Sequence, residues 1–200
     1  KRAQLEQSLR EEETRLRYIE SRIAEIDRHG GIGDYDIVVK SIAPMPFLSL
    51  HGSFENMDEA ARMIRAVAED GARQIRPALL DRLIVVARND RDDDRDRDED
   101  RLDLEIGFSL TRPSNTSVRI AGGHVLQAGE LPAVETMATI VRPGTNSASH
   151  TSFGALGLWI EANHYEVAGP CREVFLEPIT EPPGFEGALV EIQFPVRQAA

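Results

Sequence analysis

The feature that most constrains the fold of this chain is an internal match between its two halves. Residues 104–110 (LEIGFSL) align with residues 190–196 (VEIQFPV), with three identical residues at an offset of 86. The same offset carries Pro46 onto Pro132, at the head of the corresponding predicted strand. Two distant matches that share one spacing indicate an internal duplication.

Hydrophobic patterning predicts the same order of elements in each half. In the first half we predict strands at 36–43, 47–51, 83–87 and 102–110, and a helix at 57–70 that Asn56 or Ser53 caps and Gly71 ends. In the second half we predict short extended stretches at 118–120 and 123–128, strands at 132–141, 173–176 and 189–196, and a helix at 151–163. Each half therefore has the order strand–helix–strand–strand, over 36–112 and over 118–198.

The predicted fold class is α+β, with one domain at 36–198 made of these two similar halves. A single half would leave one face of its sheet uncovered, so we expect the two halves to pack about a pseudo-twofold axis. A cleft between duplicated halves is a natural place for a ligand.

Residues 1–29 carry apolar side chains in two rows with a seven-residue repeat. The rows consist of Leu5, Leu9, Leu16, Ile19, Ile23 and Ile26, and Glu12 interrupts one of them. Such a narrow stripe is typical of a coiled coil, so we predict a dimerisation helix at 1–29 and a linker at 30–35. The alternative is a helix that folds back on its own domain.

The chain has a formal net charge of −11, which argues against this segment gripping nucleic-acid phosphates by itself and favours cationic partners. No apolar run approaches the about 18 residues of a membrane span. Cys171 is the single cysteine, which excludes an internal disulfide and fits a reducing, cytoplasmic location. The Asp/Arg run at 89–101 lacks the glycine and the distal glutamate of a calcium loop, so we predict a solvated loop there.

The predicted strand at 173–176 is bounded by Pro170 and Pro178 and begins with an acidic residue, Glu173. An ionised carboxylate in a covered apolar strand is costly unless a positive charge pairs with it. Glu173 is therefore a candidate receptor for the charge of a cationic ligand. The alternative is a strand-end glutamate that faces water or pairs with Arg172 or another arginine.

Three segments resemble the gyrase-inhibitor-like effector-binding domain: DIVVK at 36–40, GPCREVFL at 169–176 and VEIQFPV at 190–196. A long helix just before such a domain resembles the dimerising coiled coil of MerR-type multidrug-sensing transcription regulators. The resemblance implies that a winged helix-turn-helix domain, absent here, precedes Lys1 and makes the DNA contacts.

The resemblance also implies that Glu173 contacts a cationic effector inside an aromatic pocket. The aromatic candidates are Phe175, Trp159 and Phe153, each with core packing as the alternative. The chain departs from the drug-binding pattern because only 6% of its residues are aromatic, which favours a narrower range of ligands.

The function that these features favour is the ligand-sensing, dimerising portion of a transcription regulator, with a small cationic lipophilic effector and no cofactor. The alternative is a gyrase-inhibitor-like hydrolase that uses Glu173 as general base, together with Tyr35 or Tyr165. None of the five histidines has metal-ligand spacing, so no metal site is predicted. A third hypothesis, a stand-alone protein-binding module, does not account for the heptad helix.

Overall fold

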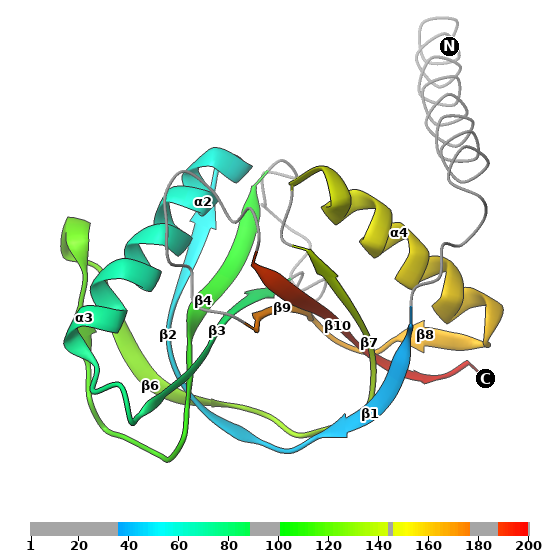
Figure 1. The fold of residues 1–200 in the computed structure, drawn as a ribbon, viewed down its shortest axis with the longest axis horizontal. Coiled ribbons are helices and arrows are strands. Elements are labelled where there is room, and N and C mark those ends of the chain that lie inside the picture. The colour runs from blue at the N-terminus through cyan, green and yellow to red at the C-terminus, as the bar shows by residue number, and fades with distance from the viewer. Residues whose placement is uncertain (1–35, 89–100, 144–145, 177–187, 200) are drawn as a thin grey trace, which may run out of the picture. The chain divides into compact units, whose positions relative to one another are not determined.

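The computed structural model of the chain describes residues 36–88, 101–143, 146–176 and 188–199. The predicted heptad helix, the linker at 30–35 and all but the last residue of the Asp/Arg run lie outside the described residues, so the coiled coil and the solvated loop stay predictions. The described elements form a ten-stranded antiparallel sheet with two long helices on one of its faces (Figure 1). Within them, no helix combines the length and the apolar composition that crossing a membrane requires.

The elements follow the predicted order in both halves. The first half contains β1 Val38–Ile42, β2 Met45–Phe54, α2 Met57–Ala66, a π-helical turn Val67–Gly71, α3 Ala72–Gln74, β3 Leu80–Ala87 and β4 Leu102–Leu110. The second contains β5 Val118–Arg119, a 3-10 turn Ala121–Gly123, β6 Val125–Leu131, β7 Val134–Pro143, α4 Asn146–Ala162, β8 Tyr165–Val167, β9 Cys171–Phe175 and β10 Leu189–Gln198. The α+β class and the strand–helix–strand–strand order are confirmed, and β8 is an element that the sequence pattern does not predict.

The strand order supports the predicted duplication. The order is β1-β7-β10-β9-β3-β4-β2-β6, extended by β5, and β8 pairs separately with β10. Read from either edge, this order relates β9 to β3, β10 to β4, β7 to β2 and β1 to β6. The pseudo-twofold axis therefore passes between β3 and β9, the two strands at the centre of the sheet.

One of the two matches used to predict the duplication, that of Pro46 to Pro132, is wrong. In the two matching segments, 104–110 and 190–196, the fourth residue pairs with Ser49 in the first half and with Thr139 in the second. Ser49 and Thr139 therefore correspond to each other, at an offset of 90 rather than 86. The stretch from β2 to β4 in the first half is therefore four residues longer than the stretch from β7 to β10 in the second. Pro46 lies within β2, opposite Glu130, whereas Pro132 precedes β7.

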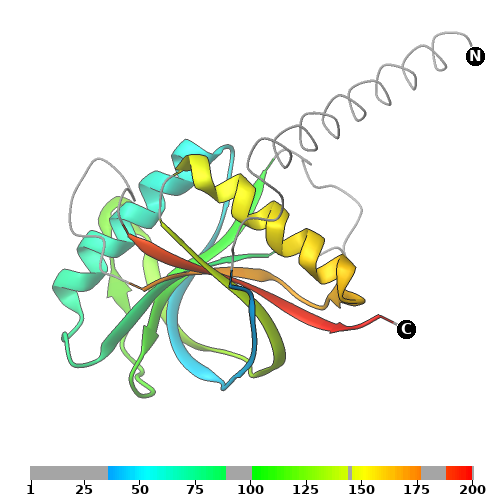
Figure 2. The ribbon, with the colours of Figure 1, turned by 45° about the vertical axis from the view of Figure 1, so that its right-hand side comes forward.

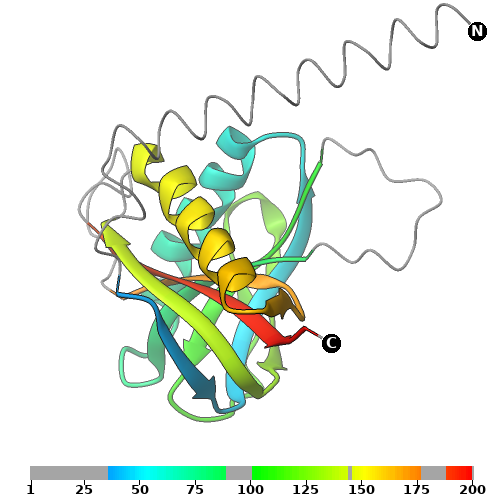
Figure 3. The same ribbon diagram turned by 90° about the vertical axis from the view of Figure 1, so that its right-hand side faces the viewer.

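Both helices pack on the same face of the sheet, as the two side views show (Figures 2 and 3). Asn56 caps α2, since its side chain accepts a hydrogen bond from the Glu59 amide at 3.0 Å. The prediction that Gly71 ends this helix is wrong, because the helical path continues through the π turn to Gln74. A Cβ at Gly71 would come within 2.5 Å of the Phe108 ring, so this glycine permits close packing on the sheet.

The face without helices is curled upon itself. β1 and β2 stand far apart in the strand order although only residues 43 and 44 join them, and the same holds for β6 and β7. These two connections draw the outer strands together across the helix-free face (Figure 1). A small apolar cluster lies on this concave side, made of Phe47, Ile84, Val86, Leu131 and Val174.

Candidate functional site

The candidate site lies on β9, at the pseudo-twofold axis. Glu173 pairs with Val85 on β3 and with Ile192 on β10, so its side chain shares the helix-covered face with these residues. Alternation along the strand sends the neighbouring Arg172 to the concave face, opposite Val86 and Gln193.

Glu173 breaks the symmetry of the duplicated fold. On the helix-covered face, the related strand β3 offers only apolar side chains, namely Leu83, Val85 and Ala87. A single carboxylate is therefore added where the two halves meet, beside the apolar core under α2. Packing alone does not require this group, so its presence points to a specific partner.

Within the described residues, Glu173 forms an ion pair with Arg142 on β7. The Arg142 Nη2 atom lies 3.3 Å from Oε2 of Glu173, and the two side chains are 6% and 28% exposed. The arginine-paired alternative considered from the sequence therefore holds in this structure, although Arg172 is not the arginine that pairs. Arg142 is 31 residues away in the sequence and two strands away in the sheet, and no local pattern identifies it.

Burial dominates the electrostatics of this carboxyl group. Desolvation raises the pKa of Glu173 above its ordinary value, and the charge of Arg142 offsets only part of that rise. Burial also raises the pKa of the neighbouring Cys171 thiol to about 11, with a further contribution from the charge of Glu173. Cys171 is therefore a protonated thiol at neutral pH and not a nucleophile.

The aromatic candidates differ in their distance from Glu173. Phe175 follows on the same face of β9 and is buried in the core under α2. Phe153 of α4 meets the Phe194 ring edge-on, with ring centroids 5.9 Å apart. It therefore lies over β10, the neighbouring strand.

Trp159 lies farther away, where it stacks on Tyr165 of β8 at 5.8 Å. β8 pairs with β10 from Val196 onward, four residues beyond Ile192, which is roughly 13 Å of strand. The structure thus places Phe175 on the same strand face as Glu173, Phe153 against Phe194 on the neighbouring strand, and Trp159 beside β8.

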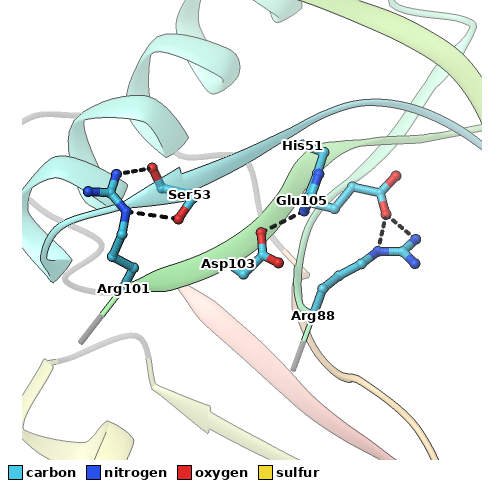
Figure 4. A network of polar contacts seen from close by, with 6 residues as sticks. All are labelled: His51, Ser53, Arg88, Arg101, Asp103 and Glu105. Atoms are coloured by element: carbon cyan, nitrogen blue, oxygen red, sulfur yellow. Dashed lines mark hydrogen bonds and ion pairs between the residues drawn. The ribbon is translucent and has the colours of Figure 1, made fainter. Parts of the chain in front are cut away.

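The concave face carries a second polar cluster, which sequence reasoning missed (Figure 4). Glu105 accepts hydrogen bonds from Ser49 at 2.6 Å and from Arg88, whose Nε lies at 2.8 Å and whose Nη2 binds the same oxygen. Beside it, Nε2 of His51 lies 2.6 Å from Asp103. The sequence did carry a signal for this cluster. Alternation along the strands predicted at 47–51 and 102–110 puts four of its side chains on one face, those of Ser49, His51, Asp103 and Glu105.

An open pocket of about 450 Å³ borders this second cluster, and Ser49, His51, Glu105, His124 and Gln127 are among its lining residues. The Glu105 carboxylate is already compensated by a charged partner with two nitrogen donors and by a hydroxyl group. Glu173 is compensated much less well, which makes it the stronger candidate for a ligand's charge.

No family model matches the sequence, and no curated protein matches it. The topology is that of the duplicated strand–helix–strand–strand domains, the fold which the resemblance to gyrase-inhibitor-like effector-binding domains implies. The chain is similar to the EcmrR C-terminal domain, with a TM-score of 0.63 and 18% identity over 83% of this chain and 99% of that domain.

Two further structures share this fold. EcmrR in its complex with DNA has a TM-score of 0.65 and 17% identity, over 99% of this chain and 70% of that protein. SAV2435 bound to tetraphenylphosphonium has a TM-score of 0.50 and 13% identity, over 81% of this chain and 94% of that one. At these identities the similarity establishes the fold.

Proposed function

We propose that this chain is the ligand-sensing portion of a transcription regulator, and that its effector is a small lipophilic cation held at Glu173. The observation that carries the proposal is a largely buried carboxylate on a central strand, compensated by one long hydrogen bond. Such a group gains from a further positive charge, because opposite charge favours its ionised form. A lipophilic cation supplies that charge together with apolar surface.

Two of the similar proteins support this role. EcmrR, whose C-terminal domain has this fold, is a protein found in a complex with DNA. SAV2435, of the same fold, is bound to tetraphenylphosphonium, which is a lipophilic cation. Because the present chain carries a net charge of −11, DNA contacts would come from another domain of the full regulator.

We further propose that Phe175 and Phe153 border the bound cation, with Trp159 at the outer end of the site. A cation over an aromatic face gains about 0.5–2 kcal/mol, depending on how fully it is desolvated. The domain has few aromatic residues, so the ligand range would be narrower than that of a broad multidrug sensor. Dimerisation through 1–29 would transmit binding, since a ligand shifts an equilibrium by its difference in affinity for the two states.

The experiment is a calorimetric titration of the full chain with tetraphenylphosphonium chloride. Glu173→Gln keeps the shape of the side chain and removes its charge, so affinity should fall about ten-fold to a hundred-fold, or about 1–3 kcal/mol. The matched control is Glu166→Gln, which removes an exposed acid of β8 that pairs with Arg197. Equal affinity of the wild-type and Glu173→Gln proteins would overturn the proposal.

The hydrolase alternative requires a tyrosine beside Glu173. Tyr165 stacks on Trp159 at the outer end of the sheet, and Tyr35 lies outside the described residues. We therefore propose binding rather than turnover at this site.

A further inference from the structure

Arg142 reaches Glu173 across an intervening strand. It lies on β7, where it pairs with Val190 of β10, and Glu173 lies one strand further on, in β9. Two strand spacings amount to roughly 9.5 Å, and Arg142 is in line with Phe175 rather than with Glu173, so both side chains must extend toward each other to make the contact. The guanidinium thus approaches the carboxylate from the side, over the floor formed by β10.

The resulting contact is a poor one for a buried ion pair. A charge-assisted N–H···O bond is usually about 2.7–2.9 Å long, whereas Arg142 stands at 3.3 Å and uses one nitrogen. In the same domain, Arg88 binds Glu105 through two nitrogens, with Nε at 2.8 Å. The fold is therefore capable of a close arginine–carboxylate pair and does not form one at Glu173.

We propose that Arg142 is an internal competitor, which occupies the cation's place at Glu173 in the empty domain and is displaced when the ligand binds. The inference rests on the proposed function and adds its regulation. A site available for only part of the time binds with an affinity reduced by that fraction. Arg142 thereby lowers the affinity of the site, so that a ligand binds only if its interaction with the site is stronger than that of the guanidinium.

This threshold selects a chemical class. A small, strongly hydrated cation offers Glu173 nothing that the guanidinium does not already supply, and it must also lose its water. A broad cation with delocalised charge adds apolar contact with the neighbouring rings, which the guanidinium does not provide. Effectors of this site are therefore expected to be wide, weakly hydrated monocations.

The test is the affinity of the full chain for tetraphenylphosphonium chloride after Arg142→Met, which keeps the length of the side chain and removes its charge. If the guanidinium holds the carboxylate for about nine-tenths of the time, affinity should rise about ten-fold. The matched control is Arg197→Met, which makes the same change of charge on an exposed part of β10 and should leave affinity within about two-fold. A folded Arg142→Met protein with unchanged or weaker affinity overturns the inference.

Two further arms keep the outcomes separate. If Arg142→Met does not fold, Arg142→Gln is titrated in its place, and the side-chain nitrogen resonances of Arg142 are followed in the wild-type protein during titration. These resonances should shift in step with saturation, and their constancy under saturating tetraphenylphosphonium would also reject the inference. If neither wild type nor variant binds, or if Glu173→Gln binds as well as wild type, the proposed function itself fails. A gain in affinity that occurs only in proteins that retain Glu173 supports both the proposed function and the role of Arg142.

Discussion

The side chain of Glu173 links the stability of the domain to pH. In the unfolded chain it titrates near its ordinary pKa of 4.5, and burial raises the pKa in the folded protein. Below pH 4.5 the group is neutral in both states and carries no penalty. As pH rises through the raised pKa, the folded protein must hold a charged, poorly compensated carboxylate, so stability is lost.

Thermal melts of wild type and Glu173→Gln should therefore diverge with pH. The two melting temperatures should agree at pH 4 and separate above pH 4.5, with that of the glutamine variant higher at pH 7. The Glu166→Gln protein serves as the control, because its acid is exposed and lies on β8. A glutamine variant that is less stable than wild type at pH 7 would show that the pair with Arg142 outweighs the cost of burial.

Sequence reasoning could identify Glu173 but not its partner. In the sequence the acid opens the apolar run at 173–176, which prolines bound, and that local pattern marks a costly charge. The predicted strand bounds were wrong, because β9 runs from Cys171 to Phe175 and Glu173 is its middle residue. Arg142 belongs to a strand two positions away in the sheet, and only the register of β7, β10 and β9 brings it near. Choosing Arg172 as a partner ignores alternation, which sends adjacent residues of a strand to opposite faces.

At the scale of elements, the first long helix depends on its N-terminal cap. The Asn56 side chain accepts the amide hydrogen of Glu59, and the Glu59 carboxylate accepts that of Glu55 at 2.7 Å. Asn56→Ala removes the first of these bonds and should cost about 1 kcal/mol of unfolding free energy, measured by urea denaturation. Asn115→Ala, in the exposed loop before β5, should change it little, and equal effects of the two changes would contradict this role of the cap.

Elements were predictable where local signals were strong. The strand at 102–110 has the predicted bounds, because its alternation is regular. β8 has only three residues, and the π turn continues a helix through a glycine that usually ends one. That glycine is explained by its contact with Phe108, and such a contact is known only once the helix is docked on the sheet.

The whole molecule is predicted to be a dimer through residues 1–29. Two apolar rows of period seven need a partner helix, so Leu16→Glu together with Ile23→Glu should give a folded monomer by light scattering. The control replaces Arg10 and Arg17, outside both rows, with glutamate and should leave the dimer intact. A dimer that survives the Leu16 and Ile23 changes would mean that copies associate elsewhere.

The palindromic order of strands means that the halves are interlocked. β1 belongs to the first half yet pairs with β7 of the second, and β6 of the second pairs with β2 of the first. When only the first half has emerged from the ribosome, β1 and β2 lack the strands of the second half with which they pair. The sheet closes only after β6 and β7, and then β9 and β10, have emerged, so the domain must fold late and as one cooperative unit.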